Sequence, residues 1–409
     1  MSESLPVLPL DPRTYDRALA CVHCGLCLAV CPTYLQTAME ADSPRGRIQL
    51  IRALADGEIP ASESVRNHLD LCLDCRACET ACPSNVVYHE LIEAYRIGID
   101  ERFPPPPLHR FYRWLCFHVL VHPARLKLAL LPVRLLQRMG LLKSIPPGPL
   151  WPSELTVAKR VSGKPTVALF AGCVGSVMFD ALGRKTAELL AASGARVLVP
   201  HGQGCCGAIH YHNAARLNAE DLARKNIDAL LLDEVDFIIS TAAGCGAMLK
   251  EYDLLLRDDR VYTRRAEQFA AKVRDVTEVL SELTLPEMKY KVELTATYHE
   301  ACHLAHGQKV RNPPRQLLAK IPGLKLAPLS ECDACCGAAG TYFLSQPEMA
   351  GKLAARKLGF IAATKAQVCV AGNAGCALHL QRQAAAREQE IRIVHPVDLI
   401  HAAVFGSSP

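Results

Sequence analysis

The sequence predicts an α+β multidomain protein in which a small, mainly helical domain precedes two duplicated α/β domains. Two cysteine-dense runs lie in the region 21–83, and the cysteines after residue 164 repeat with a common spacing. From the same point, short apolar runs alternate with Ala- and Leu-rich stretches, which is typical of parallel α/β sheets. A chain of 409 residues with 50% hydrophobic content is long enough for several cores.

The N-terminal region contains the same cysteine pattern twice. Residues 21–32 read CVHCGLCLAVCP and residues 72–83 read CLDCRACETACP. Both follow C-x2-C-x2-C-x3-C-P, the ligand pattern of bacterial-type ferredoxins. Cysteines this close pair poorly as disulfides, and structural zinc sites usually use two separated pairs. We therefore expect a bis-[4Fe-4S] ferredoxin-type domain that accepts and releases single electrons.

In two-cluster ferredoxins, the fourth cysteine of each run binds the other cluster. The expected ligands of the first cluster are Cys21, Cys24, Cys27 and Cys82. Those of the second are Cys72, Cys75, Cys78 and Cys31.

Composition and charge indicate the redox compartment of the protein and exclude some classes of partner. The chain has 19 cysteines but begins without a basic, apolar leader, so we expect reduced thiols in the cytoplasm rather than secreted disulfides. No apolar stretch reaches 18 residues, which excludes a predicted transmembrane helix. A net charge of +5 is too small to indicate nucleic-acid binding.

A basic segment bordered by prolines follows the cysteine runs. Residues 103–153 contain seven Lys or Arg and no acidic residue. A helix is expected in it, begun or kinked at Pro132, with one apolar side formed by Leu128, Leu131, Leu135, Met139 and Leu142. This helix is either a linker packed on the body of the protein or a docking face for a partner subunit or for the inner face of the cell membrane.

The C-terminal part is a duplication. Strands are expected at 165–172, 195–200 and 235–241, and again at 294–300, 324–330 and 366–372. Each copy carries a first cysteine, a Cys-Cys-Gly turn and a last cysteine: Cys173, Cys205, Cys206 and Cys245, then Cys302, Cys335, Cys336 and Cys376. The spacings of the two copies agree to within one residue, which indicates two related Rossmann-like units, and open α/β sheets place ligands at the carboxyl ends of their strands. The thiols of each unit should therefore converge.

These features divide the chain into four expected regions. They are a ferredoxin-type domain at 1–102, a helical linker at 103–163, and two Cys-Cys-Gly domains at 164–290 and 291–409.

Two motifs within these domains match patterns of other functions, but their sequence context does not support those functions. Residues 202–207, GQGCCG, match a dinucleotide fingerprint, but the second copy reads CDACCG, so the copies share only the Cys-Cys-Gly turn. Residues 299–303, HEACH, match a zinc protease motif, which requires a helix, yet they follow a predicted strand. His299 and His303 are expected beside the cysteine site, either tuning it or simply packing there.

The features that carry a family resemblance are the two cysteine runs, the stretch SPRGRI at 43–48, the stretch CLDCRACETACPSNVVY and the paired Cys-Cys-Gly domains. With these features, the chain resembles the iron-sulfur subunit of bacterial glycolate oxidase over nearly its full length. The resemblance implies a subunit that receives electrons from flavin-bearing subunits oxidising glycolate to glyoxylate and passes them toward quinone. It implies no substrate-oxidising site in this chain. The same layout occurs in glycerol-3-phosphate dehydrogenase and lactate-utilisation proteins, so the substrate stays open.

The Cys-Cys-Gly domains are similar to those of heterodisulfide reductase, whose full pattern has a fifth cysteine and holds a noncubane iron-sulfur cluster. Ala242 and Asn373 stand at that position here. Each set of four cysteines could hold an iron-sulfur cluster or zinc, or act as a redox dithiol or quinone-reducing centre. Outside this scheme, small buried residues are expected at Cys116, Cys332 and Cys369.

Overall fold

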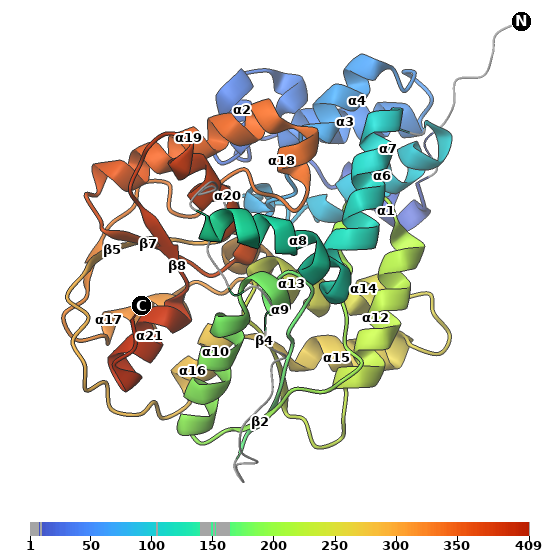
Figure 1. Ribbon diagram of the computed structural model, residues 1–409. Helices are drawn as coiled ribbons and strands as arrows, with labels where there is room; N and C mark the ends of the chain where they lie inside the picture. Colours follow the sequence, from blue (N-terminus) through green and yellow to red (C-terminus); the bar gives the residue numbers. More distant parts are fainter. Residues whose placement is uncertain are drawn as a thin grey trace, which may run out of the picture.

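The structure is a computed structural model that describes residues 10–103, 105–139 and 164–408, together with residues 8, 149 and 152. Figure 1 shows the helices of the N-terminal region gathered at one end, above two α/β units. These helices are α1 (Pro12–Leu19), α2 (Pro32–Thr37), the 3-10 helix η1 (Glu40–Asp42), α3 (Pro44–Ala55), α4 (Glu63–Asp70), α5 (Ala77–Thr80) and α6 (Tyr88–Arg102).

The cysteine runs lie mainly in the loops between these helices. The first run connects α1 to α2, and the proline that closes it, Pro32, occupies the first turn of α2. Proline fits there because the amide hydrogen it lacks would have no helical partner. A core that includes Ile51, Leu54, Leu91 and Ile92 holds α3 against α6 and so fixes both loops.

The linker forms α7 (Pro107–Leu115), the π-helix η2 (Cys116–Leu120) and α8 (Pro123–Arg138). Pro132 lies inside α8 and does not begin it. Leu128, Leu135 and Met139 are exposed, so the expectation that this side packs on the body is wrong for them; Leu142 lies outside the described residues. Within the described part of the chain, no helix is long and apolar enough to cross a membrane.

Each Cys-Cys-Gly domain contains a parallel four-stranded sheet, with strand orders β2-β1-β3-β4 and β6-β5-β7-β8. The first sheet consists of β1 (Thr166–Leu169), β2 (Arg196–Leu198), β3 (Phe237–Ser240) and β4 (Val273–Asp275). The second consists of β5 (Thr295–His299), β6 (Lys325–Ala327), β7 (Val368–Ala371) and β8 (Arg392–Val394). All six predicted strands are confirmed. The prediction missed β4 and β8, three-residue strands at the sheet edges.

Helices follow the strands in both domains. The first domain has α9 (Gly175–Met178), α10 (Asp180–Ala192), α11 (Ala208–Tyr211), α12 (Arg216–Leu230), α13 (Ala243–Lys250), α14 (Tyr252–Leu255), α15 (Thr263–Lys272) and α16 (Val276–Glu282). The second has the π-helix η3 (His303–Gly307), α17 (Asn312–Ala319), α18 (Tyr342–Ser345), α19 (Pro347–Ala363), α20 (Ala374–Ala385) and α21 (Pro396–Phe405).

The two Cys-Cys-Gly domains share one hydrophobic core. It contains Val167 and Leu189 from the first domain together with Leu318 and Leu399 from the second. Helix α10 packs on α21, and α16 packs on α17, so each domain covers part of the other. The amide of Ala243 donates to the carbonyl of Gly372 at 3.1 Å, which brings the starts of α13 and α20 side by side. Both cysteine sites are therefore fixed relative to each other.

Candidate metal centres

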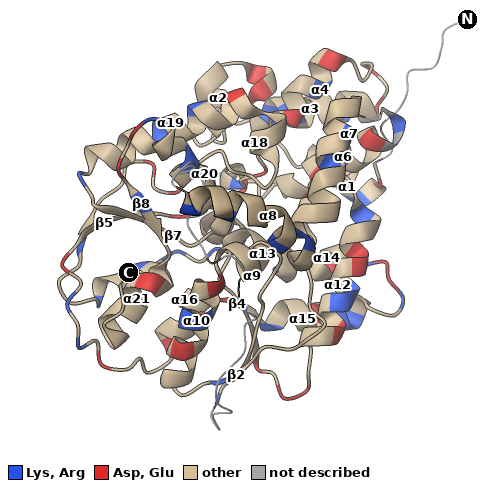
Figure 2. Ribbon diagram, in the orientation of Figure 1, with Lys and Arg blue, Asp and Glu red and all other residues tan. Residues whose placement is uncertain are grey.

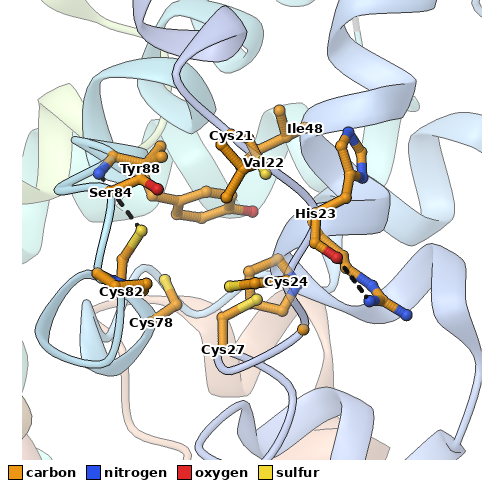
Figure 3. A pocket seen from close by; sticks show the side chains of 15 residues that line it. Cys21, Val22, His23, Cys24, Cys27, Ile48, Cys78, Cys82, Ser84 and Tyr88 are labelled. Carbon is orange, nitrogen blue, oxygen red and sulfur yellow. Dashed lines mark hydrogen bonds between the residues drawn. The ribbon is translucent and has the colours of Figure 1, made fainter.

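The four cysteines predicted to bind the first cluster line one pocket, whose space not filled by atoms is about 420 Å³. Figure 3 shows Cys21, Cys24 and Cys27 around this pocket, together with Cys82 from the second run. Cys24 is exposed to solvent. Three thiols of one run and the last thiol of the other thus converge as expected from the spacing.

The four cysteines predicted to bind the second cluster line a neighbouring pocket of about 310 Å³: Cys31, Cys72, Cys75 and Cys78. All four are buried. Tyr88 and Cys78 line both pockets, so the two sites are separated by little more than a side chain. Such proximity suits the transfer of single electrons between two centres.

A buried arginine lies beside the second pocket. Arg47 on α3 is 1% exposed; it donates to the hydroxyl of Thr33 at 3.0 Å and to the carbonyl of His68 at 2.7 Å. Its Nη1 lies 4.0 Å from the sulfur of Cys31. A fixed positive charge at this distance stabilises thiolate over thiol.

The buried thiols need a metal to ionise. Burial raises the pKa of Cys75 well above the ordinary thiol value, with Cys302 adding to the effect, and burial likewise raises the pKa of Cys78. A coordinated metal reverses this preference, because metal ligands bind as thiolates. Each pocket contains the four sulfurs of one predicted ligand set, and such a donor set fits iron-sulfur ligation.

The cysteines of the first Cys-Cys-Gly domain also converge. The Sγ atoms of Cys173 and Cys205 lie 3.5 Å apart, and Cys206 contacts both Cys205 and Cys245. The turn that follows the adjacent pair Cys205 and Cys206 requires glycine, because Gly207 has a φ of 91°. Its counterpart in the second domain, Gly337, has a φ of 89°. The repeated Cys-Cys-Gly motif thus presents two adjacent sulfurs to one site.

The second Cys-Cys-Gly domain gathers a richer set of groups. Cys302 contacts Cys335, and Cys336 contacts both Cys335 and Cys376. A ring nitrogen of His299 and the sulfurs of Cys336 and Cys376 all lie within 4.8 Å of one another. His299 ends β5 and His303 begins η3, so the HEACH stretch lacks the single helix that a zinc protease motif requires.

The second Cys-Cys-Gly site packs directly against the second ferredoxin pocket. Cys75 and Cys335 belong to one apolar cluster, against which Cys302 packs. His303 Nε2 donates to the carbonyl of Asp74 at 2.8 Å, and the hydroxyl of Tyr342 donates to the carbonyl of Leu71 at 2.9 Å. Sequence reasoning did not identify this contact, because the residues involved are more than 200 positions apart.

A buried polar network near the second pocket was also missed. Glu93 accepts from His212 at 2.7 Å and from Arg96 at 3.0 Å. Burial raises the pKa of the neighbouring Asp74 to about 6, against the opposing effect of Arg76. No local motif signals this network, since its members come from three separate segments.

Of the three remaining cysteines, Cys116 and Cys369 are buried as expected. Cys332 is only partly buried, so the expectation is wrong for it. Its carbonyl accepts from the ring of His299 at 3.1 Å.

Family models match three segments of the chain. Residues 17–86 match the model of a 4Fe-4S dicluster domain, and residues 167–250 and 296–381 each match the model of a cysteine-rich domain. Together these matches cover more than half of the chain.

Curated relatives match over most of their length. The chain is 36% identical to the probable glycolate oxidase iron-sulfur subunit of Bacillus subtilis, covering 93% of both chains. It is 34% identical to the glycolate oxidase iron-sulfur subunit of Escherichia coli, covering 94% of both. Among solved structures, a hypothetical protein from Helicobacter pylori matches 97% of this chain and 73% of its own with a TM-score of 0.56 at 10% identity, which shows a shared fold.

Proposed function

This chain belongs to the family of glycolate oxidase iron-sulfur subunits, and we propose that it carries electrons from a flavin-bearing subunit through two [4Fe-4S] clusters toward quinone. The observation that carries the proposal is the pair of adjacent pockets, which bring the first three cysteines of each run beside the fourth cysteine of the other run. When bound, such clusters accept and release one electron at a time. Substrate oxidation is assigned to the partner, and the chain acts as a subunit of an oxidoreductase complex.

We assign Cys21, Cys24, Cys27 and Cys82 to the first cluster and Cys72, Cys75, Cys78 and Cys31 to the second. We also assign the domains as 1–102, 103–163, 164–290 and 291–409, and treat each Cys-Cys-Gly domain as Rossmann-like, since its strand order reverses direction beside its first strand. An additional iron-sulfur or zinc centre is assigned to the Cys-Cys-Gly cysteines.

The first cluster site is the proposed face for the flavin-bearing partner. Cys24 is exposed, and so is a set of large apolar side chains on the same segment and its neighbours: Leu19, Val22, Leu26, Leu35 and Met39. Exposed apolar residues around an exposed ligand favour a protein partner that excludes water there. We expect Val22→Asp to reduce recovery of the flavin subunit in a pull-down, whereas Val261→Asp, similarly exposed on the first Cys-Cys-Gly domain, should not.

The helices α7 and α8 form the proposed contact with the cytoplasmic face of the membrane, where quinone is reached. Their exposed apolar side chains are Leu108, Phe111, Trp114, Leu115, Leu128, Leu135, Leu136 and Met139. Figure 2 shows Lys and Arg but no Asp or Glu on α8. An apolar face with basic flanks and an exposed tryptophan suits the surface of anionic lipids.

Vesicle binding tests this surface. The purified complex should sediment with phosphatidylglycerol vesicles at low salt, and Leu128→Glu combined with Met139→Glu should reduce the bound fraction several-fold. Leu217→Glu is the matched control, because Leu217 is 75% exposed on α12, outside the two helices proposed to contact the membrane. Equal binding by all three proteins would exclude this face as the membrane contact.

The central experiment is anaerobic purification of the chain with its co-expressed partners, followed by analysis of iron, sulfide and zinc and by EPR of the reduced protein. About eight irons per chain with an interacting two-cluster signal would support the proposal. Zinc with almost no iron or sulfide would refute it. Electron transfer to a quinone analogue with glycolate, lactate or glycerol 3-phosphate as donor then identifies the substrate.

A second candidate function places chemistry in the Cys-Cys-Gly domains, as a thiol-disulfide or quinone-reducing centre. The 3.5 Å contact between Cys173 and Cys205 favours it, because two thiols this close can exchange electrons as a dithiol pair. Cys205→Ser and Cys335→Ser distinguish the candidates. Lost turnover with intact ferredoxin clusters would favour chemistry or an essential relay in these domains, whereas unchanged turnover would leave them a scaffold.

A further inference from the structure

The two Cys-Cys-Gly domains share their four cysteines but differ at two positions beside them. Three residues before the first cysteine, the first domain has Phe170 and the second has His299. Three residues before the last cysteine, the first domain has Ala242 and the second has Asn373. Polar groups able to bind or orient a metal therefore flank only the second set of cysteines at these two positions.

His299 is held with one ring nitrogen pointing away from its hydrogen-bond partner. Its Nδ1 lies 3.1 Å from the carbonyl oxygen of Cys332, and because a carbonyl only accepts, Nδ1 carries the hydrogen. The other nitrogen, Nε2, therefore has a free lone pair in the neutral ring. The residue is fully buried, and Nε2 has no hydrogen-bond partner among the described residues.

An imidazole fixed through Nδ1 to a backbone carbonyl is the usual arrangement of a metal-binding histidine. Leaving a buried acceptor without a partner is unfavourable, and binding of a metal ion would offset that cost. The sulfurs of Cys336 and Cys376 lie within 4.8 Å of a ring nitrogen of His299. Tetrahedral ligands at the usual zinc-sulfur distance of about 2.3 Å lie about 3.8 Å apart, so small side-chain movements suffice.

Asn373 forms a hydrogen bond with the sulfur of Cys376. Its Nδ2 donates to Cys376 Sγ at 3.3 Å, while its Oδ1 accepts from the amide of Gly244 at 3.2 Å. The second bond fixes the orientation of the amide, so that the NH2 group faces the sulfur. The buried ammonium of Lys357 adds a positive charge near Cys336 and Cys335. All of these groups favour thiolates in this site.

We propose that the second Cys-Cys-Gly domain binds a metal centre with mixed ligation, in which Nε2 of His299 is a ligand beside the thiolates of Cys336 and Cys376. Cys335, which contacts Cys336, is the fourth ligand of a tetrahedral site, and Cys302 lies next to Cys335. The metal is of the class that accepts both sulfur and imidazole, zinc or iron. This inference rests on the proposal that these domains hold an additional centre, and it is independent of glycolate as substrate.

The test compares matched variants of the purified complex. His299→Phe gives the second domain the residue of the first, and should lose the zinc, or the iron in excess of about eight per chain, that the wild type contains. Phe170→Ala, the corresponding change in the first domain, should lose neither. His299→Cys supplies a thiolate instead and should keep the metal. In every variant, an unchanged ferredoxin EPR signal shows that the chain has folded.

The nature of the ligand is read from spectroscopy. If the metal is zinc, absorption at the zinc edge should show nitrogen and sulfur neighbours in the wild type and sulfur alone in His299→Cys. If it is iron, 15N-histidine labelling should produce a nitrogen coupling in pulsed EPR that His299→Cys removes. Metal content equal in wild type and His299→Phe would overturn the role of His299 alone. Wild-type complex without metal beyond the ferredoxin irons would overturn the additional centre as well.

Discussion

A buried ion pair joins the ferredoxin-type domain to the first Cys-Cys-Gly domain. Arg76 lies between Cys75 and Ala77 in the second cysteine run, and its side chain is 3% exposed. Its guanidinium donates to both oxygens of Glu251, with Nη2 2.9 Å from Oε2. Glu251 follows α13, the helix that carries Cys245. We therefore predict that Glu251→Gln destabilises the contact between the two domains.

The magnitude follows from the pKa of the carboxyl. Burial alone would raise the pKa of Glu251, but Arg76 outweighs burial and lowers it from 4.5 to about 2. At about 1.36 kcal/mol per pKa unit, this corresponds to about 3 kcal/mol of stability. Because the folded-state pKa is depressed, the contribution is complete above about pH 4.5 and is lost as the pH falls toward 2. Breaking a buried pair typically costs about 3–5 kcal/mol, which agrees.

The loss of stability can be measured by urea unfolding under anaerobic conditions at neutral pH. Circular dichroism and cluster absorption report the unfolding. Glu251→Gln should lower the free energy of unfolding by about 3 kcal/mol. Glu348→Gln is the control, since Glu348 pairs with Lys352 on a helix surface with 83% of its side chain exposed. It should leave the free energy of unfolding nearly unchanged. A loss for Glu251→Gln no larger than the control value would refute the reasoning.

Three further predictions concern the other domains and the second cluster site. Gly337→Ala should lower the midpoint of thermal unfolding more than Gly207→Ala does. An added Cβ at position 337 would lie 2.7 Å from the carbonyl oxygen of Ala350, whereas at position 207 its nearest neighbour, in Ala219, would be 3.3 Å away. Equal effects of the two substitutions would contradict this prediction. Burial raises the pKa of Asp275 from 3.8 to about 6, so stability declines as the pH rises between these values and the buried carboxyl must ionise. Asp275→Asn should remove about 1–2 kcal/mol of that decline in unfolding measurements from about pH 5 upward, and an unchanged slope would argue against it. Arg47→Met should lower the reduction potential of the second cluster in an EPR-monitored titration, because it removes a positive charge that favours the reduced state. Arg47→Lys keeps the charge and should retain most of the wild-type potential. Identical potentials in the wild type and both variants would exclude this effect of the charge.

The sequence predicts which cysteines of the two runs lie together, because this information is local. Spacing within each run, combined with the ligand pattern of ferredoxins, identifies which cysteine of the second run should join the first, and the structure brings those residues into one pocket. The six predicted strands lie in apolar runs and are recognisable for the same reason. The strands β4 and β8 are not part of an apolar run, because Lys272, Arg274 and Asp275 lie in or beside β4, and Glu390, Arg392 and His395 lie in or beside β8.

Contacts between distant segments could not be predicted. The pair Arg76 and Glu251 is separated by 175 positions, and each residue alone looks like an ordinary surface charge. The basic linker shows the opposite failure: its apolar helical side is typical of a packed helix, yet Leu128 and Met139 are exposed. Periodicity shows which side chains share a face, but not whether another part of the chain covers that face.

The position of the N-terminal domain explains why two copies of one fold differ. It contacts the first Cys-Cys-Gly domain largely through charged groups, such as Arg76 with Glu251 and Glu93 with His212. It contacts the second through the cysteine site, where Cys75 and Cys335 share an apolar cluster. The second site is thus the one that lies beside the pocket proposed to hold the second ferredoxin cluster. The same site has His299 and Asn373 where the first has Phe170 and Ala242, so the groups suited to a metal occur in the copy that borders this proposed cluster site.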